Sequence, residues 1–185
     1  MKKFILLFLV LLVVVPAAVN AQQKTLIGEE VTHGGGGGPV VKLTYLNNTF
    51  GILVGGYGGW IINHTFLIGG GGYGLTTDIF VSGNKLVFGY GGLVAEYIGF
   101  SDEIIHFKAG TLIGAGNATF DKEDPGAAFF VLEPGIDAEF NITSFFRLCA
   151  GVSYRFVIGA TGLSGVSDAS LSGLAGEIVL KFGSF

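Results

Sequence analysis

The sequence predicts an all-β protein, an eight-stranded antiparallel up-and-down transmembrane β-barrel, on three observations. Half of the 185 residues are hydrophobic, yet 33 are glycine and only 13% are charged, whereas soluble domains carry about 25% charged residues. Apolar and polar residues alternate with a period of two along almost the whole chain after residue 39. No stretch beyond the first 21 residues holds an apolar run long enough for a membrane helix, so a membrane-spanning form has to be built from strands.

The first residues have the pattern of a secretory signal peptide. Lys2 and Lys3 precede an apolar run over residues 4–15, and small residues follow as far as Ala21. The run is too short to span a bilayer, which takes about 20 residues. We therefore predict a signal peptide over residues 1–21.

The remaining chain divides into an arm and a single barrel domain. Residues 22–38 are polar and end in five glycines, so we predict a flexible, glycine-rich arm. Residues 39–185 hold the eight candidate strands, most of them long enough for the about 9 to 11 residues that a tilted membrane strand needs. The candidate strands are residues 39–46, 49–60, 64–75, 85–97, 103–114, 127–139, 144–158 and 173–182.

The alternation places the charged residues of the clearest strands on one face and apolar residues on the other. In residues 144–158, for example, Phe146 and Leu148 alternate with Arg147 and Cys149. A Lys or Arg that faces lipid costs roughly 2–4 kcal/mol at the bilayer centre. We therefore predict that the charges face inward, where they must be paired. The predicted interior charge network comprises Lys42, His106, Lys108, Glu133, Asp137, Glu139, Arg147, Arg155, Glu177 and Lys181.

Aromatic residues gather near the ends of the candidate strands. Membrane barrels carry such residues as two girdles, one at each interface between lipid and water. The residues predicted to form the girdles are Tyr45, Phe50, Trp60, Phe66, Phe140, Phe146, Tyr154, Phe156 and Phe182.

A formal G-x-G-x-x-G match occurs at Gly69, Gly71 and Gly74. A nucleotide cradle needs a helix after the glycines, because the helix N-terminus binds the phosphate, and no helical period follows here. If residues 61–63 form a hairpin turn, two glycine runs instead face each other and let a small barrel bend sharply. The predicted barrel-bending glycines are Gly55, Gly56, Gly58, Gly59, Gly69, Gly70, Gly71 and Gly72.

The connections between strands alternate in length. Those after the second, fourth and sixth candidate strands are short, and those after the third, fifth and seventh are longer. Transmembrane barrels have short turns at the periplasmic end and longer loops outside. The first hairpin, at Asn47 and Asn48, is an exception because it is tight, and asparagine suits its left-handed positions.

Eight such strands, a signal peptide, inward charges and the aromatic Phe185 together resemble the small eight-stranded outer-membrane barrels of the OmpA/OmpX type, over about residues 39–185. The resemblance implies the outer membrane of a Gram-negative-type bacterium, with outer-membrane lipid around a monomeric barrel and residues 22–38 in the periplasm. It also implies recognition of the terminal aromatic by the outer-membrane assembly machinery. The surface partner is unknown.

Charge and composition restrict the function. The chain carries 10 Lys and Arg against 14 Asp and Glu, a net charge of −4, which argues against nucleic acid as a partner. One cysteine and three scattered histidines suggest neither a metal site nor a cofactor.

We expect a non-enzymatic barrel with a salt-bridged, side-chain-filled interior that serves envelope integrity or surface interaction. Three alternatives stay open. The first is a lipid A-modifying barrel enzyme, for which Ser153 and His106 are the candidate pair. The second is a narrow pore, and the third is a soluble secreted, lipocalin-like ligand-binding barrel. A soluble barrel has its apolar face inside and a membrane barrel has it outside, so the orientation of the strands distinguishes the third alternative from the others.

Overall fold

The structure is a computed structural model that describes residues 31–121 and 126–185. The predicted signal peptide lies outside the described residues. The described part contains nine strands and one short helix. Their bounds are β1 His33–Leu46, β2 Thr49–Ile62, β3 Phe66–Leu75, β4 Ile79–Val81, β5 Asn84–Gly99, β6 Ile105–Phe120, β7 Ala127–Asn141, β8 Phe146–Ile158, α2 Asp168–Leu171 and β9 Gly173–Ser184.

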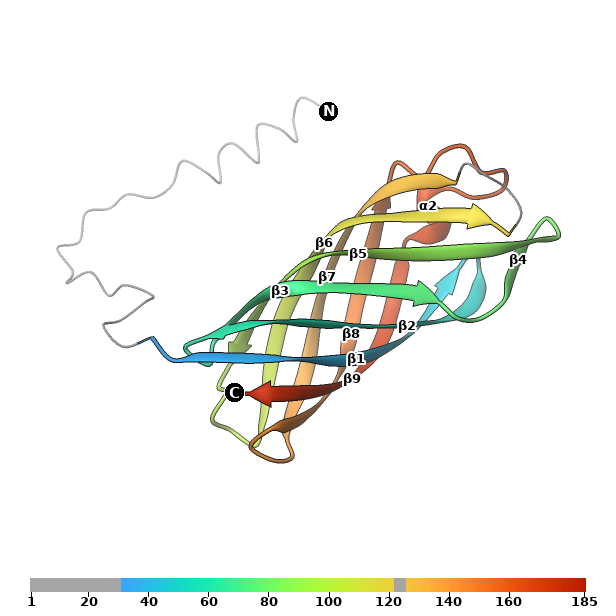
Figure 1. The fold of residues 1–185 in the computed structure, drawn as a ribbon. Helices are drawn as coiled ribbons and strands as arrows, with labels where there is room; N and C mark the ends of the chain where they lie inside the picture. Colours follow the sequence, from blue (N-terminus) through green and yellow to red (C-terminus); the bar gives the residue numbers. More distant parts are fainter. Residues whose placement is uncertain (1–30, 122–125) are drawn as a thin grey trace, which may run out of the picture. The chain divides into compact units, whose positions relative to one another are not determined.

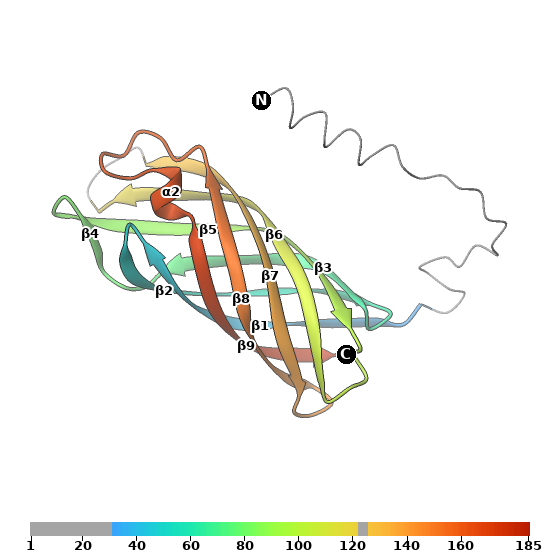
Figure 2. The same cartoon turned by 180° about the vertical axis from the view of Figure 1, so that it is seen from behind.

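The strands form one closed barrel (Figures 1 and 2). Each long strand pairs antiparallel with its neighbours in sequence, β3 pairs with β5, and β1 pairs with β9 to close the ring. The three-residue β4 pairs with β5 and forms a hairpin with it beyond the end of β3. The predicted eight-stranded antiparallel up-and-down barrel is therefore confirmed, with β4 as an addition to it.

The two ends of the barrel differ in the length of their connections. Residues 63–65, 100–104 and 142–145 connect strands at one end, which we call the short-turn end. Residues 76–83 and 159–172, together with Asp121 and Gly126, lie at the opposite end, the long-loop end, as does the tight turn at Asn47 and Asn48. Both asparagines have positive φ, 48° and 59°, as the turn of a two-residue hairpin requires.

Several strand boundaries differ from the prediction, most of all at β1 and β6. Strand β1 begins at His33 rather than at Pro39, because the backbone of the glycine run bonds to β2 on one side and β9 on the other. A glycine-rich composition therefore does not make this part of the arm flexible. Strand β6 continues to Phe120 alongside β5, and α2 was not predicted. No helix in the described part of the chain is both long and apolar enough to cross a membrane.

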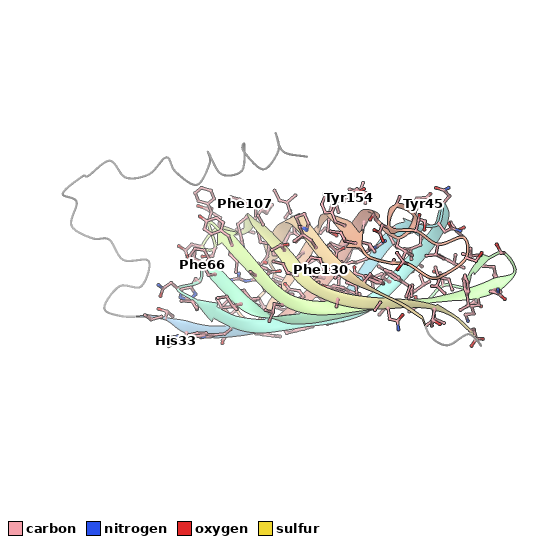
Figure 3. The ribbon with its side chains drawn as sticks, turned by 90° about the horizontal axis from the view of Figure 1, so that it is seen from above. His33, Tyr45, Phe66, Phe107, Phe130 and Tyr154 are labelled. Atoms are coloured by element: carbon pink, nitrogen blue, oxygen red, sulfur yellow. The ribbon has the colours of Figure 1, made fainter. Side chains whose placement is uncertain are left out.

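The apolar face of the strands lies outside and the charged face inside. Ile136 is 53% exposed and Leu180 is 41% exposed, whereas Lys181, next to Leu180, is fully buried. Figure 3 shows Phe66, Phe107, Tyr45 and Tyr154 projecting from the outer surface of the wall. A water-soluble barrel has the opposite arrangement. The orientation of the strands therefore contradicts the soluble, lipocalin-like alternative.

Glycines from neighbouring strands meet in rows across the wall. Gly59 pairs with Gly36 of β1 and with Gly69 of β3, and Gly71 pairs with Gly92 of β5. A Cβ atom at Gly69 would overlap the carbonyl oxygen of Gly58, so the strands approach too closely here for a side chain. The close approach gives the strong curvature that closing a small barrel requires.

Replacement of an inward glycine should destabilise the barrel far more than replacement of an outward one. We expect Gly69→Ala to lower the free energy of unfolding by at least about 1–3 kcal/mol, because the backbone has to move. Gly74→Ala should be neutral or stabilising by about 0.4–1 kcal/mol, since no atom lies within 4 Å of the added Cβ. Urea unfolding in detergent micelles measures both, and equal midpoints for the two variants would contradict this account of the glycine rows.

Candidate functional site

The interior of the barrel is divided along its length. Toward the long-loop end it holds apolar side chains, such as Leu86 and Phe88 of β5, and we call this part the apolar half. Further along the same face of β5 lies the buried Glu96, within the part that we call the polar half. The ionic side chains of the strands thus gather in the half of the lumen nearer the short-turn end.

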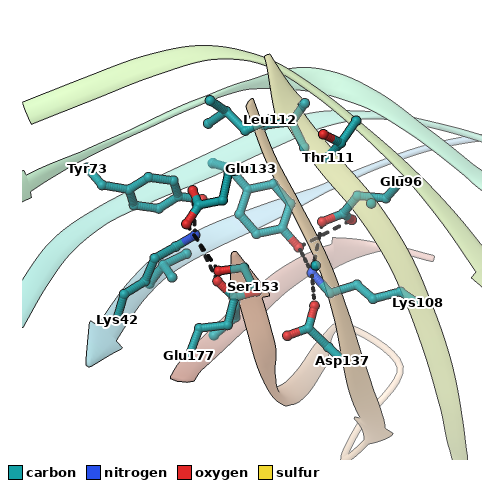
Figure 4. A pocket seen from close by; sticks show the side chains of 16 residues that line it. Lys42, Tyr73, Glu96, Lys108, Thr111, Leu112, Glu133, Asp137, Ser153 and Glu177 are labelled. Carbon is teal, nitrogen blue, oxygen red and sulfur yellow. Dashed lines mark hydrogen bonds and ion pairs between the residues drawn. The ribbon is translucent and has the colours of Figure 1, made fainter. Parts of the chain in front are cut away.

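A first ion cluster is centred on Lys42 of β1. Its Nζ lies 3.1 Å from Glu133 Oε2 and 2.9 Å from Glu177 Oε2. Glu133 also accepts hydrogen bonds from the hydroxyls of Tyr90, at 2.8 Å, and Ser153, at 3.1 Å. The cluster therefore connects β1 with β5, β7, β8 and β9, as Figure 4 shows for Lys42 and its two carboxylates.

A second cluster is centred on Lys108 of β6. Its Nζ lies 2.8 Å from Glu96 Oε1 and 3.2 Å from Asp137 Oδ2. It also donates to the Tyr57 hydroxyl at 3.0 Å and lies over the face of that ring, 4.8 Å from its centroid. Tyr57 in turn lies opposite the bare Gly71, so the glycine row leaves the space that this ring occupies.

A third cluster surrounds Glu139 of β7, nearest the short-turn end. Its carboxylate accepts from Arg147 at 2.7 Å and from Lys181 at 3.1 Å, and His106 Nε2 lies 3.4 Å away. The ring of Phe185 lies 3.9 Å from the guanidinium carbon of Arg147. An aromatic ring therefore covers the polar half from this end.

Arg155 differs from the prediction because it belongs to none of these clusters. It is fully buried, and no carboxylate of the described residues lies within ion-pair distance of it. Its Nε donates to the carbonyl oxygen of Leu171 at 2.8 Å, and the guanidinium lies 5.2 Å from the centre of the Phe88 ring. Both terminal nitrogens lack hydrogen-bond partners among the described atoms. Arg155 thus holds the end of α2 from inside the barrel.

Glu96 completes the second cluster but is absent from the predicted charge network. Glu96 has the same parity as Leu86 and Phe88, so the sequence alone leaves the register of that strand open. The structure turns all three inward. The inward face of β5 changes from apolar to ionic residues along its length, so its register cannot be read from the alternation alone.

The aromatic residues predicted as girdles all lie on the outer face. Trp60 is 50% exposed, and neighbouring rings contact each other, as with Phe146 and Phe182, whose centroids are 5.0 Å apart. In Figure 3, Phe66 and Phe107 lie toward one end and Tyr45 toward the other. Each of the predicted girdle residues is fully or partly exposed on this face: Tyr45, Phe50, Trp60, Phe66, Phe140, Phe146, Tyr154, Phe156 and Phe182.

The structure does not bring the candidate catalytic pair together. His106 lies opposite Glu139 and Ser153 opposite Gly135, four positions apart on β7, a rise of about 13 Å. The Ser153 hydroxyl donates to Glu133 instead. Within residues 31–121 and 126–185, no group of three His, Cys, Asp or Glu side chains is placed to hold a metal ion.

A small cavity remains between the first two clusters. It has a volume of about 40 Å³ and is lined by Lys42, Lys108, Glu133, Asp137 and Glu177, among others. A buried water needs roughly 10–15 Å³ of such space. The cavity therefore has room for a few water molecules and not for a continuous channel.

A closed antiparallel eight-stranded wall with apolar residues outside and paired ions inside defines the small outer-membrane type of barrel. Neisserial surface protein A (NspA) has a similar structure, with a TM-score of 0.59 and 14% identity, covering 85% of this chain and all of NspA. Ail, the attachment invasion locus protein of Yersinia pestis, solved with the heparin analogue sucrose octasulfate, is also similar, at TM-score 0.51 and 14% identity, covering 82% of this chain and 97% of Ail.

The structural similarity places this chain among the small eight-stranded outer-membrane barrels of the OmpA/OmpX type in fold. No protein-family model matches the sequence, and no curated protein matches it either. The likeness is therefore one of fold, and function has to be argued from the residues of this chain.

Removal of the Glu139 charge should destabilise the barrel strongly. Glu139→Gln leaves Arg147 and Lys181 buried without their main counter-ion, which costs about 3–5 kcal/mol of unfolding free energy. The matched control is Asp78→Asn, because Asp78 pairs with Lys85 at 2.6 Å in an exposed position. The control should not move the midpoint of urea unfolding, and a Glu139→Gln midpoint within error of wild type would contradict the assigned role.

Proposed function

We propose that this protein is a non-enzymatic, monomeric barrel of the outer membrane of a Gram-negative-type bacterium, serving envelope integrity or surface interaction. The main support for this proposal is that the charged side chains lie inside the wall and the apolar ones outside. Lys42, Lys108 and Lys181 are at most 3% exposed, while the outer face of the same strands is apolar. Lipid stabilises such an outer face, and water does not.

The proposal includes export and assembly. Residues 1–21 act as the signal peptide and are removed, and the outer-membrane assembly machinery inserts the barrel. The short-turn end then faces the periplasm and the long-loop end faces outward, as in other barrels of this kind.

A stable, filled interior supports a structural role over catalysis or conduction. The Ser153 hydroxyl donates to Glu133 in the first cluster, and His106 lies 3.4 Å from Glu139 in the third, so the two side chains belong to different clusters. Buried apolar side chains, including Phe88, Phe129 and Leu171, occupy the lumen toward the long-loop end. An eight-stranded barrel is only wide enough for its own side chains.

Surface interaction would involve the long-loop end. An open crevice of about 360 Å³ lies there, and its lining is uncharged. The crevice lies between the first hairpin and α2, which the backbone bond from Asn47 N to Ser170 O, at 2.7 Å, holds together. Its lining includes Tyr45, Asn47, Asn48, Ser167 and Ser170.

The depth of Trp60 tests the membrane proposal, since it is the single tryptophan of the chain. Trp60 lies on the outer face near the short-turn end. In vesicles we expect its fluorescence to be quenched most by lipids brominated near the headgroup, because girdle residues lie at the interface.

Val54 provides the matched control because it lies on the same outer face of β2, six positions nearer the long-loop end. In the variant that combines Trp60→Phe with Val54→Trp, bromines deeper in the acyl chains should quench most. Fluorescence that no brominated lipid quenches in either protein would show that the wall does not contact lipid.

The charge of the long-loop end argues against a polyanionic sugar ligand such as the one bound by Ail. Asp78, Asp121 and Asp168 lie in connections at this end, and Lys85 is paired with Asp78. We expect no retention of the detergent-solubilised protein on a sulfated-sugar column at physiological salt. Retention that added salt abolishes would overturn this part of the proposal.

A further inference from the structure

Two carboxyl groups of the polar half meet over a bare stretch of backbone. Asp137 of β7 and Glu177 of β9 both pair with Gly151 of β8. A Cβ atom at Gly151 would overlap Asp137 Oδ1, so the Asp137 side chain lies directly over this glycine. Both side chains line the same internal cavity.

The remaining partners of this pair leave one oxygen without a donor. Asp137 Oδ2 is 3.2 Å from Lys108 Nζ, and Glu177 Oε2 is 2.9 Å from Lys42 Nζ. Asp137 Oδ1 is buried and has no hydrogen-bond partner among the described donors, in a residue that is only 6% exposed. Two ionised carboxylates in one cavity repel each other, whereas a protonated carboxyl can donate a hydrogen bond to an ionised neighbour.

The ionic groups of the polar half do not balance if every carboxyl is ionised. Each of the four cations contacts at least one carboxylate, but there is one carboxylate more. Arg155 does not supply the missing charge, because it lies outside the ion-pair distance of all of them. The cations are Lys42, Lys108, Arg147 and Lys181, and the carboxylates are Glu96, Glu133, Asp137, Glu139 and Glu177.

His106 also lies beside this network. Its Nδ1 lies 3.1 Å from the carbonyl oxygen of Glu103, and a carbonyl only accepts, so Nδ1 carries a proton. Its Nε2 lies 3.4 Å from Glu139 but makes no hydrogen bond.

We propose that the internal cavity is a proton site, in which Asp137 keeps one proton at neutral pH and donates it to Glu177. The proton turns a repulsion between the carboxylates of β7 and β9 into a hydrogen bond. The groups around the pair come from every neighbouring element: Lys42, Tyr57, Tyr73, Glu96, Lys108, Glu133, Glu139, Cys149, Ser153 and Lys181.

The site makes stability depend on pH in a defined direction. An aspartate in the unfolded chain is ionised at neutral pH, so the folded barrel binds one proton more than the unfolded chain. Stability therefore falls as the pH rises, and the unfolding equilibrium constant increases by up to about tenfold per pH unit in this range.

Asp137→Asn separates this proposal from an ordinary salt bridge. The amide has the shape of the protonated carboxyl, donates to Glu177 and still accepts from Lys108. We therefore expect the purified full-length variant in detergent micelles to be at least as stable as wild type at neutral pH, without the alkaline loss. Glu133→Gln is the control, because Glu133 accepts from Tyr90 and Ser153 and contacts Lys42. It should be destabilised and keep the pH dependence.

Infrared spectroscopy detects the proton directly. Wild type and Glu133→Gln should show the C=O stretch of a protonated carboxyl at neutral pH, shifted in deuterium oxide, and Asp137→Asn should lack it. Absence of this band in wild type overturns the proposal, as does destabilisation of Asp137→Asn to the level of Glu133→Gln. A wild-type stability that depends on sodium concentration, without the band, would assign the cavity to a metal cation instead.

Discussion

The pairing of buried charges is the interaction on which the rest of this barrel depends. Because the outer wall is apolar, the ionic side chains of the strands are enclosed in the lumen, where each needs a partner. The partners come from different strands. Lys42 links β1 to β7 and β9, Lys108 links β6 to β5 and β7, and Glu139 links β7 to β8 and β9. Most of these contacts join neighbouring strands, but Lys42 with Glu133 and Glu139 with Lys181 join strands that do not pair in the sheet, so the contacts that neutralise charge also cross-link the wall from inside.

The glycine rows and the ion clusters are parts of one arrangement. Close approach of β1, β2, β3 and β5 is compatible only with residues that lack a side chain, and it leaves bare backbone inside the wall. Tyr57 lies opposite Gly71 and Tyr73 opposite Gly55. Tyr57 accepts from Lys108, and Lys42 lies 4.1 Å from the centre of the Tyr73 ring. The curved part of the wall thus supplies the aromatic groups that contact Lys42 of β1 and Lys108 of β6.

The sequence was sufficient for the fold class and for the inward charges, because a period of two survives any error in strand ends. It was not sufficient where composition and pairing disagree. Gly34–Gly38 have the composition of a linker, yet both neighbouring strands bond to their backbone. Phe88 and Glu96 share an inward face, since the lumen changes from apolar to ionic along β5, and no local pattern reveals such a change. The contact of Arg155 with α2 depends on a loop whose path only the tertiary structure defines.

That loop closes the lumen with the chain's own residues. The Asp168 carboxylate accepts from the backbone N–H groups of Gly159 and Ala160, at 3.1 and 2.7 Å, which draws the two ends of the loop together. Leu163 and Leu171 are buried, and Arg155 holds the Leu171 carbonyl from below. Burying a guanidinium with two unpaired nitrogens costs free energy, so the contact between Arg155 and α2 is kept despite this desolvation cost. A partner that approaches from the long-loop end therefore meets the outer surface of the loops and not the ionic interior, and recognition has to be sought on that surface.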